Sequence, residues 1–252
     1  MVSRKIKRIR LHEYYLSGYE KFSDDKKTVH GAYGPRMFNM RGRVDQIDSV
    51  IRLLRRKPSS RQAVIQLFNA EDLLKDYNDI PCTCTVQFLI RKGQLHVVTH
   101  MRSNDAFLGL PHDVFAFTFL QELFARTLGV KLGTYKHAVV SLHLYDDDLA
   151  KVRKFIAEGW QSRISMPEMP SGDPWSNISK LLLAEEKFRK GKDPSVASLG
   201  MPRYWADLAR LLRVFALTKA KKPVGSSLTK MTTPVYDAYI KKRVVSGQTR
   251  SA

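Results

Sequence analysis

The residues best suited to chemistry in this 252-residue chain are two cysteines near its middle. Cys82 follows Pro81 directly in the segment DIPCTCTVQF, and Cys84 stands two positions later. A thiolate is a strong nucleophile, and a nearby cation favours its formation. A cysteine at the edge of a strand is more often a small buried hydrophobe, however. The cysteines alone therefore do not establish a reaction.

A polar cluster lies between two apolar segments in HMRSNDAFLGLPHD, residues 100–113. Its members are Arg102, Ser103, Asn104, Asp105 and Asp113. Burying so many polar groups without a ligand would be costly in free energy. The cluster therefore favours a ligand site close in sequence to Cys82.

The spacing of the cysteines and the net charge limit the classes of protein to which this chain can belong. One residue between the cysteines is too few for the usual Cys-x-x-Cys metal spacing and too close for an ordinary disulfide, so we expect reduced thiols, no metal and a cytoplasmic location. No apolar stretch of signal or membrane length is visible, which predicts a soluble protein. The formal charge of +19 favours phosphate-bearing partners. Nucleic acid is one such partner, but no zinc-finger ligand set or RNA-recognition signature supports it.

Hydrophobic periodicity predicts helices and strands in alternation over the first two thirds of the chain. We expect short strands, with Lys92-Gly93 as a hairpin turn, at residues 63–68, 85–91, 95–100 and 137–145. Amphipathic or buried helices are predicted at residues 45–56, 111–128 and 146–159, the second of them with Asp113 in its first turn.

The composition changes after residue 164. SMPEMPSGDP (165–174) is a proline-rich connection, and helical patterns follow near 175–190 and over 202–217. The tail from Lys219 is basic and polar, with a short helix expected at VYDAYIKK. We therefore divide the chain into a domain at 1–164 and a helical C-terminal extension with a basic tail at 165–252.

Several segments together resemble the thymidylate synthase and deoxycytidylate hydroxymethylase family. They occur in the family's order between Gly31 and about Glu158, over about half of the chain: GAYGPRMF, KPSSRQAVIQLFN, IPCTCTVQFLIRKGQLHVVTHMRSNDAFLGLPHDVFAF and HLY. Chance explains a Pro-Cys, an Arg-Ser-x-Asp and a Gly-Leu-Pro at these intervals far less well than homology does. The resemblance implies an α/β (α+β) protein with a large mixed β-sheet flanked by helices, assembled as a homodimer.

The resemblance implies that Cys82 is the catalytic nucleophile, adding to carbon 6 of a pyrimidine ring. Arg102 would lower the pKa of that thiol and, with Ser103, hold the nucleotide phosphate. Arg61 would reach the phosphate bound to the neighbouring subunit. The family usually has a second arginine beside it, where this chain has Gln62, which predicts weaker phosphate binding.

Other positions acquire roles in the same way. His143 and Tyr145 match the pair that binds the sugar hydroxyl, and Tyr33 matches a tyrosine that organises proton transfer. Asp105 matches the carboxylate that binds the pterin of 5,10-methylenetetrahydrofolate, whose pocket Leu108 and Gly109 would line. An exposed loop aspartate is the alternative interpretation of Asp105.

Asp113 is the most informative departure from a synthase. Thymidylate synthases carry an asparagine here, whose amide can donate to oxygen 4 of uracil. A carboxylate instead accepts from the exocyclic amine of cytosine, and cytidylate hydroxymethylases of the family carry aspartate at this point. The alternative is an aspartate that only stabilises a helix N-terminus, worth under about 1 kcal/mol.

Further departures fit a changed substrate or reaction. Thr83, Met101 and Ser141 stand where synthases usually have histidine, glutamine and aspartate. The family's catalytic glutamate lies on a segment upstream of a stretch resembling residues 4–30, and we expect this chain to lack it.

The resemblance implies one-carbon transfer from methylenetetrahydrofolate to carbon 5 of a pyrimidine nucleoside monophosphate, and Asp113 favours hydroxymethylation of cytidylate or deoxycytidylate. A thymidylate synthase that methylates dUMP to dTMP is the second hypothesis. An inactive nucleotide- or RNA-binding relic of the fold is the third.

Overall fold

The computed structural model describes residues 13–160, 163–224 and 231–248. The chain forms two compact units, Met1–Gly159 and Trp160–Ala252. Each unit is described here by itself. The division into domains at residues 164 and 165 stays a prediction.

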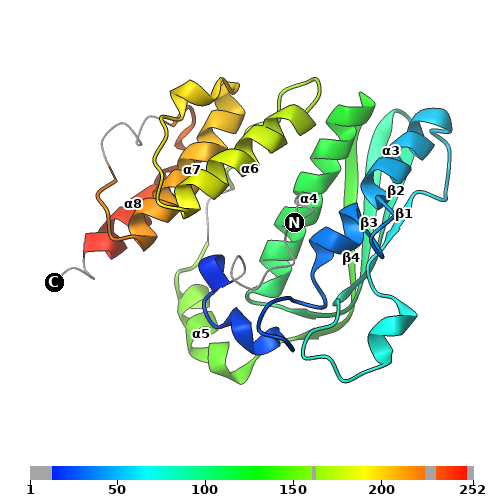
Figure 1. Ribbon diagram of the computed structural model, residues 1–252, viewed down its shortest axis with the longest axis horizontal. Coiled ribbons are helices and arrows are strands. Elements are labelled where there is room, and N and C mark those ends of the chain that lie inside the picture. The colour runs from blue at the N-terminus through cyan, green and yellow to red at the C-terminus, as the bar shows by residue number, and fades with distance from the viewer. Residues whose placement is uncertain (1–12, 161–162, 225–230, 249–252) are drawn as a thin grey trace. The chain divides into compact units, whose positions relative to one another are not determined.

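The first unit is built on a mixed sheet of four strands in the order β1-β2-β3-β4 (Figure 1). The strands are β1 (Val64–Gln66), β2 (Thr83–Arg91), β3 (Gln94–Asp105) and β4 (Lys131–His143). β2 pairs antiparallel with both β1 and β3, whereas β3 and β4 are parallel. The predicted mixed sheet flanked by helices is confirmed.

Turn chemistry explains two of the strand ends. Lys92 and Gly93 join β2 to β3 with φ of 50° and 70°, the positive values that a two-residue hairpin turn requires. The strand predicted at 137–145 is present with different bounds, because β4 begins at Lys131, where its pairing with Gln94 starts, and ends at His143. Tyr145 has left the strand and precedes the short 3-10 helix η3 (Asp146–Asp148).

Helices α2 (Tyr33–Phe38) and α3 (Gln46–Arg56) follow the short 3-10 helix η1 (Tyr19–Phe22). The Asp45 carboxylate accepts from the backbone N–H of Asp48 and so caps α3. The apolar positions that predicted this helix form its buried face: Ile47, Val50, Ile51 and Leu54. The same unit ends with α5 (Leu149–Ala157).

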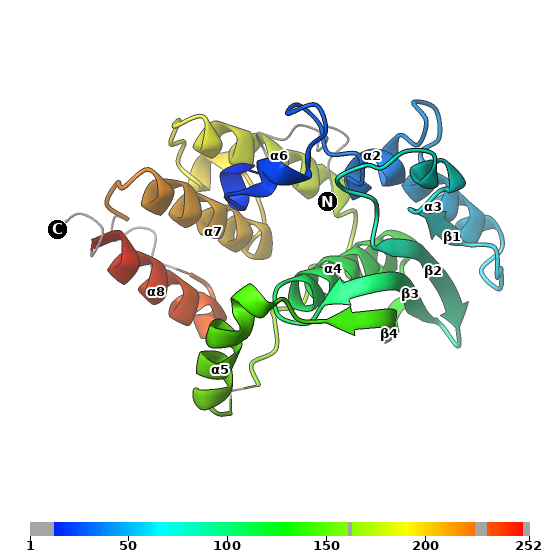
Figure 2. The ribbon, with the colours of Figure 1, turned by 90° about the horizontal axis from the view of Figure 1, so that it is seen from below.

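The long helix α4 (Gly109–Leu128) packs against β3 and β4 (Figure 2). Phe124, which is fully buried, stacks on Phe88 of β2 with 4.3 Å between ring centroids. Gly129 in the left-handed conformation ends the helix, as predicted. The expectation that Asp113 lies in the first turn was wrong, because the helix begins at Gly109 and Asp113 falls in its second turn.

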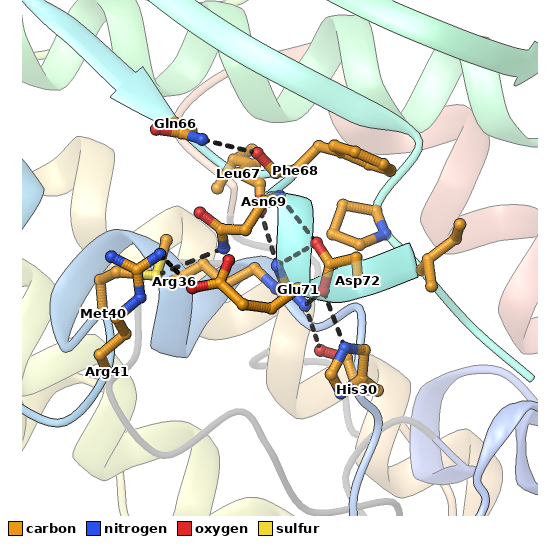
Figure 3. Close-up of polar contacts among 12 residues, drawn as sticks. His30, Arg36, Met40, Arg41, Gln66, Leu67, Phe68, Asn69, Glu71 and Asp72 are labelled. Atoms are coloured by element: carbon orange, nitrogen blue, oxygen red, sulfur yellow. Dashed lines mark hydrogen bonds and ion pairs between the residues drawn. The ribbon is translucent and has the colours of Figure 1, made fainter. Parts of the chain in front are cut away.

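A buried ion pair ties α2 to the 3-10 helix η2 (Ala70–Leu73), as Figure 3 shows. The Arg36 guanidinium donates to both Asp72 oxygens at 2.7 Å, and His30 Nε2 lies 2.8 Å from the same carboxylate. Arg36 also donates to the Leu67 carbonyl at 2.7 Å. Asp72 is only 2% exposed, so these partners replace the water that its charge would otherwise need.

The second unit is helical. It contains α6 (Trp175–Arg189), α7 (Arg203–Lys219) and α8 (Asp237–Gln248), with the 3-10 helices η4 (Ala197–Leu199) and η6 (Pro234–Tyr236). The helices predicted after residue 165 are therefore present, and α8 is longer than expected. Its apolar core includes Ala184, Phe188, Val196, Ala206 and Ala209. Across the ranges that the structure describes, no helix is long and apolar enough to cross a membrane.

We predict that Asp72→Ala lowers the free energy of unfolding by about 3–5 kcal/mol, because it leaves the buried Arg36 charge without its partner. Urea denaturation followed by circular dichroism measures this. Glu71→Ala is the control, since Glu71, next to Asp72 in η2, makes an exposed ion pair with Arg41. Equal small effects from both changes would show that the buried pair is not a stabilising contact.

Candidate functional site

Cys82 lies immediately before β2, with Arg102 of β3 beside it. The guanidinium Nη2 lies 3.7 Å from Cys82 Sγ. It is held there by two backbone carbonyls, because Nε donates to Pro81 at 3.0 Å and Nη2 to Ile80 at 3.2 Å. The backbone N–H of Arg102 also donates to the Cys82 carbonyl at 2.9 Å. The turn that carries the thiol therefore also fixes its cation.

Arg102 lowers the pKa of the Cys82 thiol, as expected, but burial has the larger effect. Burial raises the pKa of the thiol, and Arg102 lowers it by a smaller amount. Asp79 and Asp113 raise it further. The net pKa is above the usual value, so Arg102 limits the rise and does not produce a thiolate by itself. Cys82 and Cys84 are both free thiols, as expected.

Tyr33 of α2 joins this group through Thr83. Its hydroxyl accepts from the backbone N–H of Thr83 at 3.0 Å and from Thr83 Oγ1 at 2.9 Å. Burial raises the pKa of Tyr33, and Asp113 adds to the rise. The phenol is therefore protonated at neutral pH, with its own hydrogen left to donate. Thr83, where synthases usually have histidine, is the side chain that orients it.

Asp113 of α4 is the acidic member of the group. Burial raises the pKa of its carboxyl to about 6, while His112 and a hydrogen bond from Asn104 oppose the rise. Its charge also raises the pKa of Tyr33 and of Cys82. An aspartate that only stabilised a helix end would be solvated and would lie in the first turn. Asp113 is half-buried and lies in the second turn, which favours a role in reading a ligand.

A second group forms where β3 and β4 run in parallel. Ser103 Oγ lies 3.2 Å from His143 Nδ1, and Asp105 pairs with His143 in the strand register. The His143 ring meets the Tyr145 ring edge to face, with 4.9 Å between centroids. Tyr145 is 59% exposed. The structure thus brings the predicted sugar-binding pair together with Ser103.

Asp105 closes the start of α4. Its carboxylate accepts from the backbone N–H groups of Phe107, Leu108 and Gly109 at 3.0, 2.8 and 3.0 Å. Burial raises the pKa of this carboxyl, but the three bonds outweigh burial and the net pKa is lowered. Gly109 is required here, since a Cβ would lie 2.4 Å from Asn104 Oδ1.

Arg61 is not part of its own chain's site. It is exposed and precedes β1, and its carbonyl accepts from the side chain of Gln87 in the middle of β2. Within the described ranges, no group of three or more His, Cys, Asp or Glu side chains could hold a metal ion.

Sequence reasoning did not assign four residues near Asp113. Tyr19 of η1 has a pKa of about 12, raised by burial and by Asp79, Cys82 and Asp113. Asn104 Nδ2 lies 3.2 Å from His137 Nε2, and His137 Nδ1 lies 2.5 Å from the Tyr135 hydroxyl. Only Asn104 carried a signal, as a member of the polar cluster.

The chain is similar in sequence to known proteins of one family. Residues 2–178 match the family model described as thymidylate synthase. The chain belongs to the thymidylate synthase family. It is 32% identical over 132 residues to thymidylate synthase 1 of Bacillus spizizenii, covering 50% of this chain and 47% of the relative. It is 31% identical over 150 residues to thymidylate synthase of Buchnera aphidicola, covering 58% and 56%. The chain thus spans about half the length of these curated relatives.

Proposed function

We propose that this member of the thymidylate synthase family transfers a one-carbon unit from 5,10-methylenetetrahydrofolate to carbon 5 of a pyrimidine nucleoside monophosphate. The observation that carries the proposal is the grouping of Cys82, Arg102, Tyr33 and Asp113, since it combines a nucleophile, a cation, a phenol and a half-buried carboxyl.

Carbon 5 of a pyrimidine is a poor nucleophile until a thiolate adds to carbon 6. Cys82 forms the bond to carbon 6 and carbon 5 then carries the electron pair that attacks the one-carbon unit. Arg102 stabilises the thiolate, whose formation burial opposes. Loss of the proton on carbon 5 would then expel the folate amine from the one-carbon unit and leave an exocyclic methylene on the ring. Addition of a hydride or of water to that methylene would return the electron pair that expels Cys82 as a thiolate. Tyr33, protonated and fixed by Thr83, holds a proton within this group.

The residues at the start of α4 fit a folate. The folate supplies the one-carbon unit and, for a methyl product, a hydride. Asp105 is an ionised carboxylate, and its oxygens keep acceptor capacity beyond the three backbone bonds. Leu108 beside it is 49% exposed and offers an apolar surface to a flat ring.

The base that Asp113 would favour is cytosine. With a pKa of about 6, the carboxyl is mainly ionised at neutral pH and can only accept. It therefore matches the exocyclic amine of cytosine and repels oxygen 4 of uracil. This supports a cytidylate or deoxycytidylate substrate, with water adding to the exocyclic methylene to give a hydroxymethyl group. The family assignment keeps methylation of dUMP to dTMP as the second candidate.

We also propose a homodimer in which Arg61 serves the neighbouring subunit. Arg61 lies apart from its own Cys82, and β4 exposes large apolar side chains that a partner sheet could cover: Leu132, Val140 and Leu142. We further propose that Arg102 and Ser103 contact the nucleotide phosphate and that His143 and Tyr145 contact the sugar. The proposed location of the protein is the cytoplasm.

The catalytic proposal predicts exchange of the carbon 5 hydrogen. With deoxycytidylate labelled with tritium at carbon 5, the protein should release tritium when methylenetetrahydrofolate is added. Cys82→Ser should abolish release, because a hydroxyl is a far weaker nucleophile, while Cys84→Ser should retain most of it. Equal loss from both substitutions would contradict the assignment of the nucleophile.

Base choice should depend on pH. At pH 7.5 we expect deoxycytidylate to bind more tightly than deoxyuridylate, by a factor of about ten or more. The preference should weaken as the pH falls through about 6, because protonated Asp113 can donate to oxygen 4 of uracil. Calorimetric titration of both nucleotides measures this, and Asp113→Asn should erase or reverse the preference. A uracil preference at pH 7.5 would leave the synthase as the better hypothesis.

The dimer predicts that Arg61→Ala weakens nucleotide binding by roughly tenfold although Arg61 is remote from its own site. Arg91→Ala is the control, since Arg91 is another exposed arginine near this end of β2. Light scattering at micromolar concentration reports the assembly. A monomer, or equal effects from the two changes, would count against a shared site.

A further inference from the structure

The helical second unit is strongly basic, and the chemistry proposed above does not use it. Residues 160–252 hold 17 lysines and arginines against 7 aspartates and glutamates, so this unit carries +10 of the chain's formal charge of +19. The family match ends at residue 178, so α7 and α8 lie entirely beyond it. The charge therefore belongs to a part of the chain for which the family supplies no role.

Helices α7 and α8 run in the same direction, because two contacts join them in order. The Asp207 carboxylate, in the second turn of α7, accepts from the backbone N–H of Thr232 at 3.0 Å, shortly before α8 begins. The Arg243 guanidinium, in the second half of α8, lies over the Phe215 ring near the end of α7, 4.4 Å from its centroid. The C-terminal ends of α7 and α8 therefore lie on the same side of this unit.

Two further contacts join α6 to α7 in the same order. Lys180 Nζ, in the first half of α6, donates to the Gly200 carbonyl at 2.9 Å, three residues before α7 begins. Arg213, in the second half of α7, forms an ion pair with Asp193, four residues after α6 ends. The C-terminal ends of α6 and α7 are thus brought together.

Exposed lysines gather where α6 and α7 end, in the segments 187–192 and 219–222. We call this surface the basic end, and its lysines are Lys187, Lys190, Lys192, Lys219, Lys221 and Lys222. Backbone hydrogen bonds hold both segments against the helices, because the N–H of Lys192 donates to the Lys187 carbonyl and that of Lys222 to the Leu217 carbonyl, both at 2.9 Å. The cations of the basic end therefore have fixed points of attachment.

The carboxylates close in sequence to the basic end are already engaged. Each makes an ion pair with a cation of the same unit: Glu185 with Arg189, Glu186 with Lys190 and Asp193 with Arg213. The charge of the basic end is therefore only partly neutralised, and repulsion among its lysines costs free energy unless an anion is bound. Lysines at a helix C-terminus also offset the macrodipole, but this effect fades beyond the last turn, where Lys192 and Lys222 lie.

We propose that the basic end binds the phosphate backbone of a nucleic acid, independently of base sequence. Its cations are exposed and spread over the ends of two helices, which fits a polymer with a phosphate at each step better than one small anion. Such binding needs no motif that reads bases, which agrees with a sequence that has no zinc-finger ligand set or RNA-recognition signature.

An anionic membrane surface is the other polyanion that a lysine cluster could meet. Stable attachment to a membrane combines cations with apolar side chains that enter the bilayer. Among the described residues of this unit, the large exposed apolar side chains lie outside both segments of the basic end: Trp160, Ile164, Leu183 and Tyr239. The composition of the surface therefore favours a nucleic acid.

The test uses the full chain in four forms: unchanged, a basic-end variant, its arginine counterpart and a charge-matched control. The basic-end variant carries Lys187→Gln, Lys192→Gln, Lys221→Gln and Lys222→Gln, and the counterpart carries arginine at the same positions. The control loses the same charge at exposed lysines of the first unit, through Lys26→Gln, Lys27→Gln, Lys75→Gln and Lys154→Gln.

Fluorescence anisotropy measures binding to a labelled DNA duplex of about 20 base pairs and to a single-stranded RNA of about 20 nucleotides, at about 50–200 mM salt. Flotation with vesicles that contain phosphatidylserine tests the membrane alternative. Circular dichroism checks that each form is folded. If the basic-end variant is not, the pair Lys221→Gln and Lys222→Gln replaces it, because both residues follow the end of α7.

We expect the unchanged protein to bind at least one of the two nucleic acids with a dissociation constant of about 10⁻⁶–10⁻⁴ M near physiological salt. The basic-end variant should bind at least about tenfold more weakly. The slope of log affinity against log salt should fall by about 2–4, because each lost phosphate contact removes about 0.7–0.9. The arginine counterpart should bind like the unchanged protein, and the control should change the affinity by less than about twofold.

Absence of binding to both nucleic acids at about 50 mM salt would overturn the inference. Equal weakening in the basic-end variant and the control would also overturn it, because binding would then follow overall charge. Weak binding by the arginine counterpart, or vesicle binding at least as tight as nucleic-acid binding, would do the same.

The inference does not depend on the proposed reaction, so the two can fail separately. Calorimetry with deoxycytidylate should give the same affinity for the unchanged protein and the basic-end variant. A loss of deoxycytidylate binding in the variant would show that these lysines serve the pyrimidine site, which also refutes the inference.

Discussion

One carboxylate, that of Asp105, sets the geometry on which the site depends. It accepts from three successive backbone N–H groups and so fixes where α4 begins. Since α4 starts at Gly109, Asp113 falls in the second turn and is half-buried. The same carboxylate sits at the end of β3, in register with His143 of β4. The start of α4, the end of β3 and the position of Asp113 are therefore linked through a single residue.

Burial is the main electrostatic influence on the group around Cys82. It raises the pKa of the Cys82 thiol, the Tyr33 phenol and the Asp113 carboxyl together, so each favours its neutral form. Specific partners oppose this rise. Arg102 lowers the pKa of the Cys82 thiol, and Asn104 and His112 lower that of the Asp113 carboxyl. Of the three groups, only the Asp113 carboxyl, with a pKa of about 6, titrates near neutral pH, so local contacts decide its protonation there.

Framework interactions hold the segments that carry these groups. The buried Arg36–Asp72 pair joins α2, which carries Tyr33, to η2, in the connection between β1 and Cys82. The parallel pairing of β3 with β4 aligns Ser103 with Ser141 and Asp105 with His143. Stacking of Phe124 on Phe88 packs α4 against the sheet. Residues far apart in sequence are thereby brought to one end of the sheet.

The sequence by itself predicted most of the elements and the family, because turn residues and apolar periodicity are local signals: Lys92-Gly93 forms the predicted hairpin turn, and the helix predicted at 45–56 is α3. It also identified Cys82, Arg102 and Asp113 as a set. Only the tertiary structure decided that burial outweighs Arg102 at the thiol, that Asp113 lies one turn inside α4, and that Asn104 faces the helix. These features depend on desolvation and on a break, after Met101, in the alternation of buried and exposed side chains along β3. Both arise from packing between segments that no local pattern encodes.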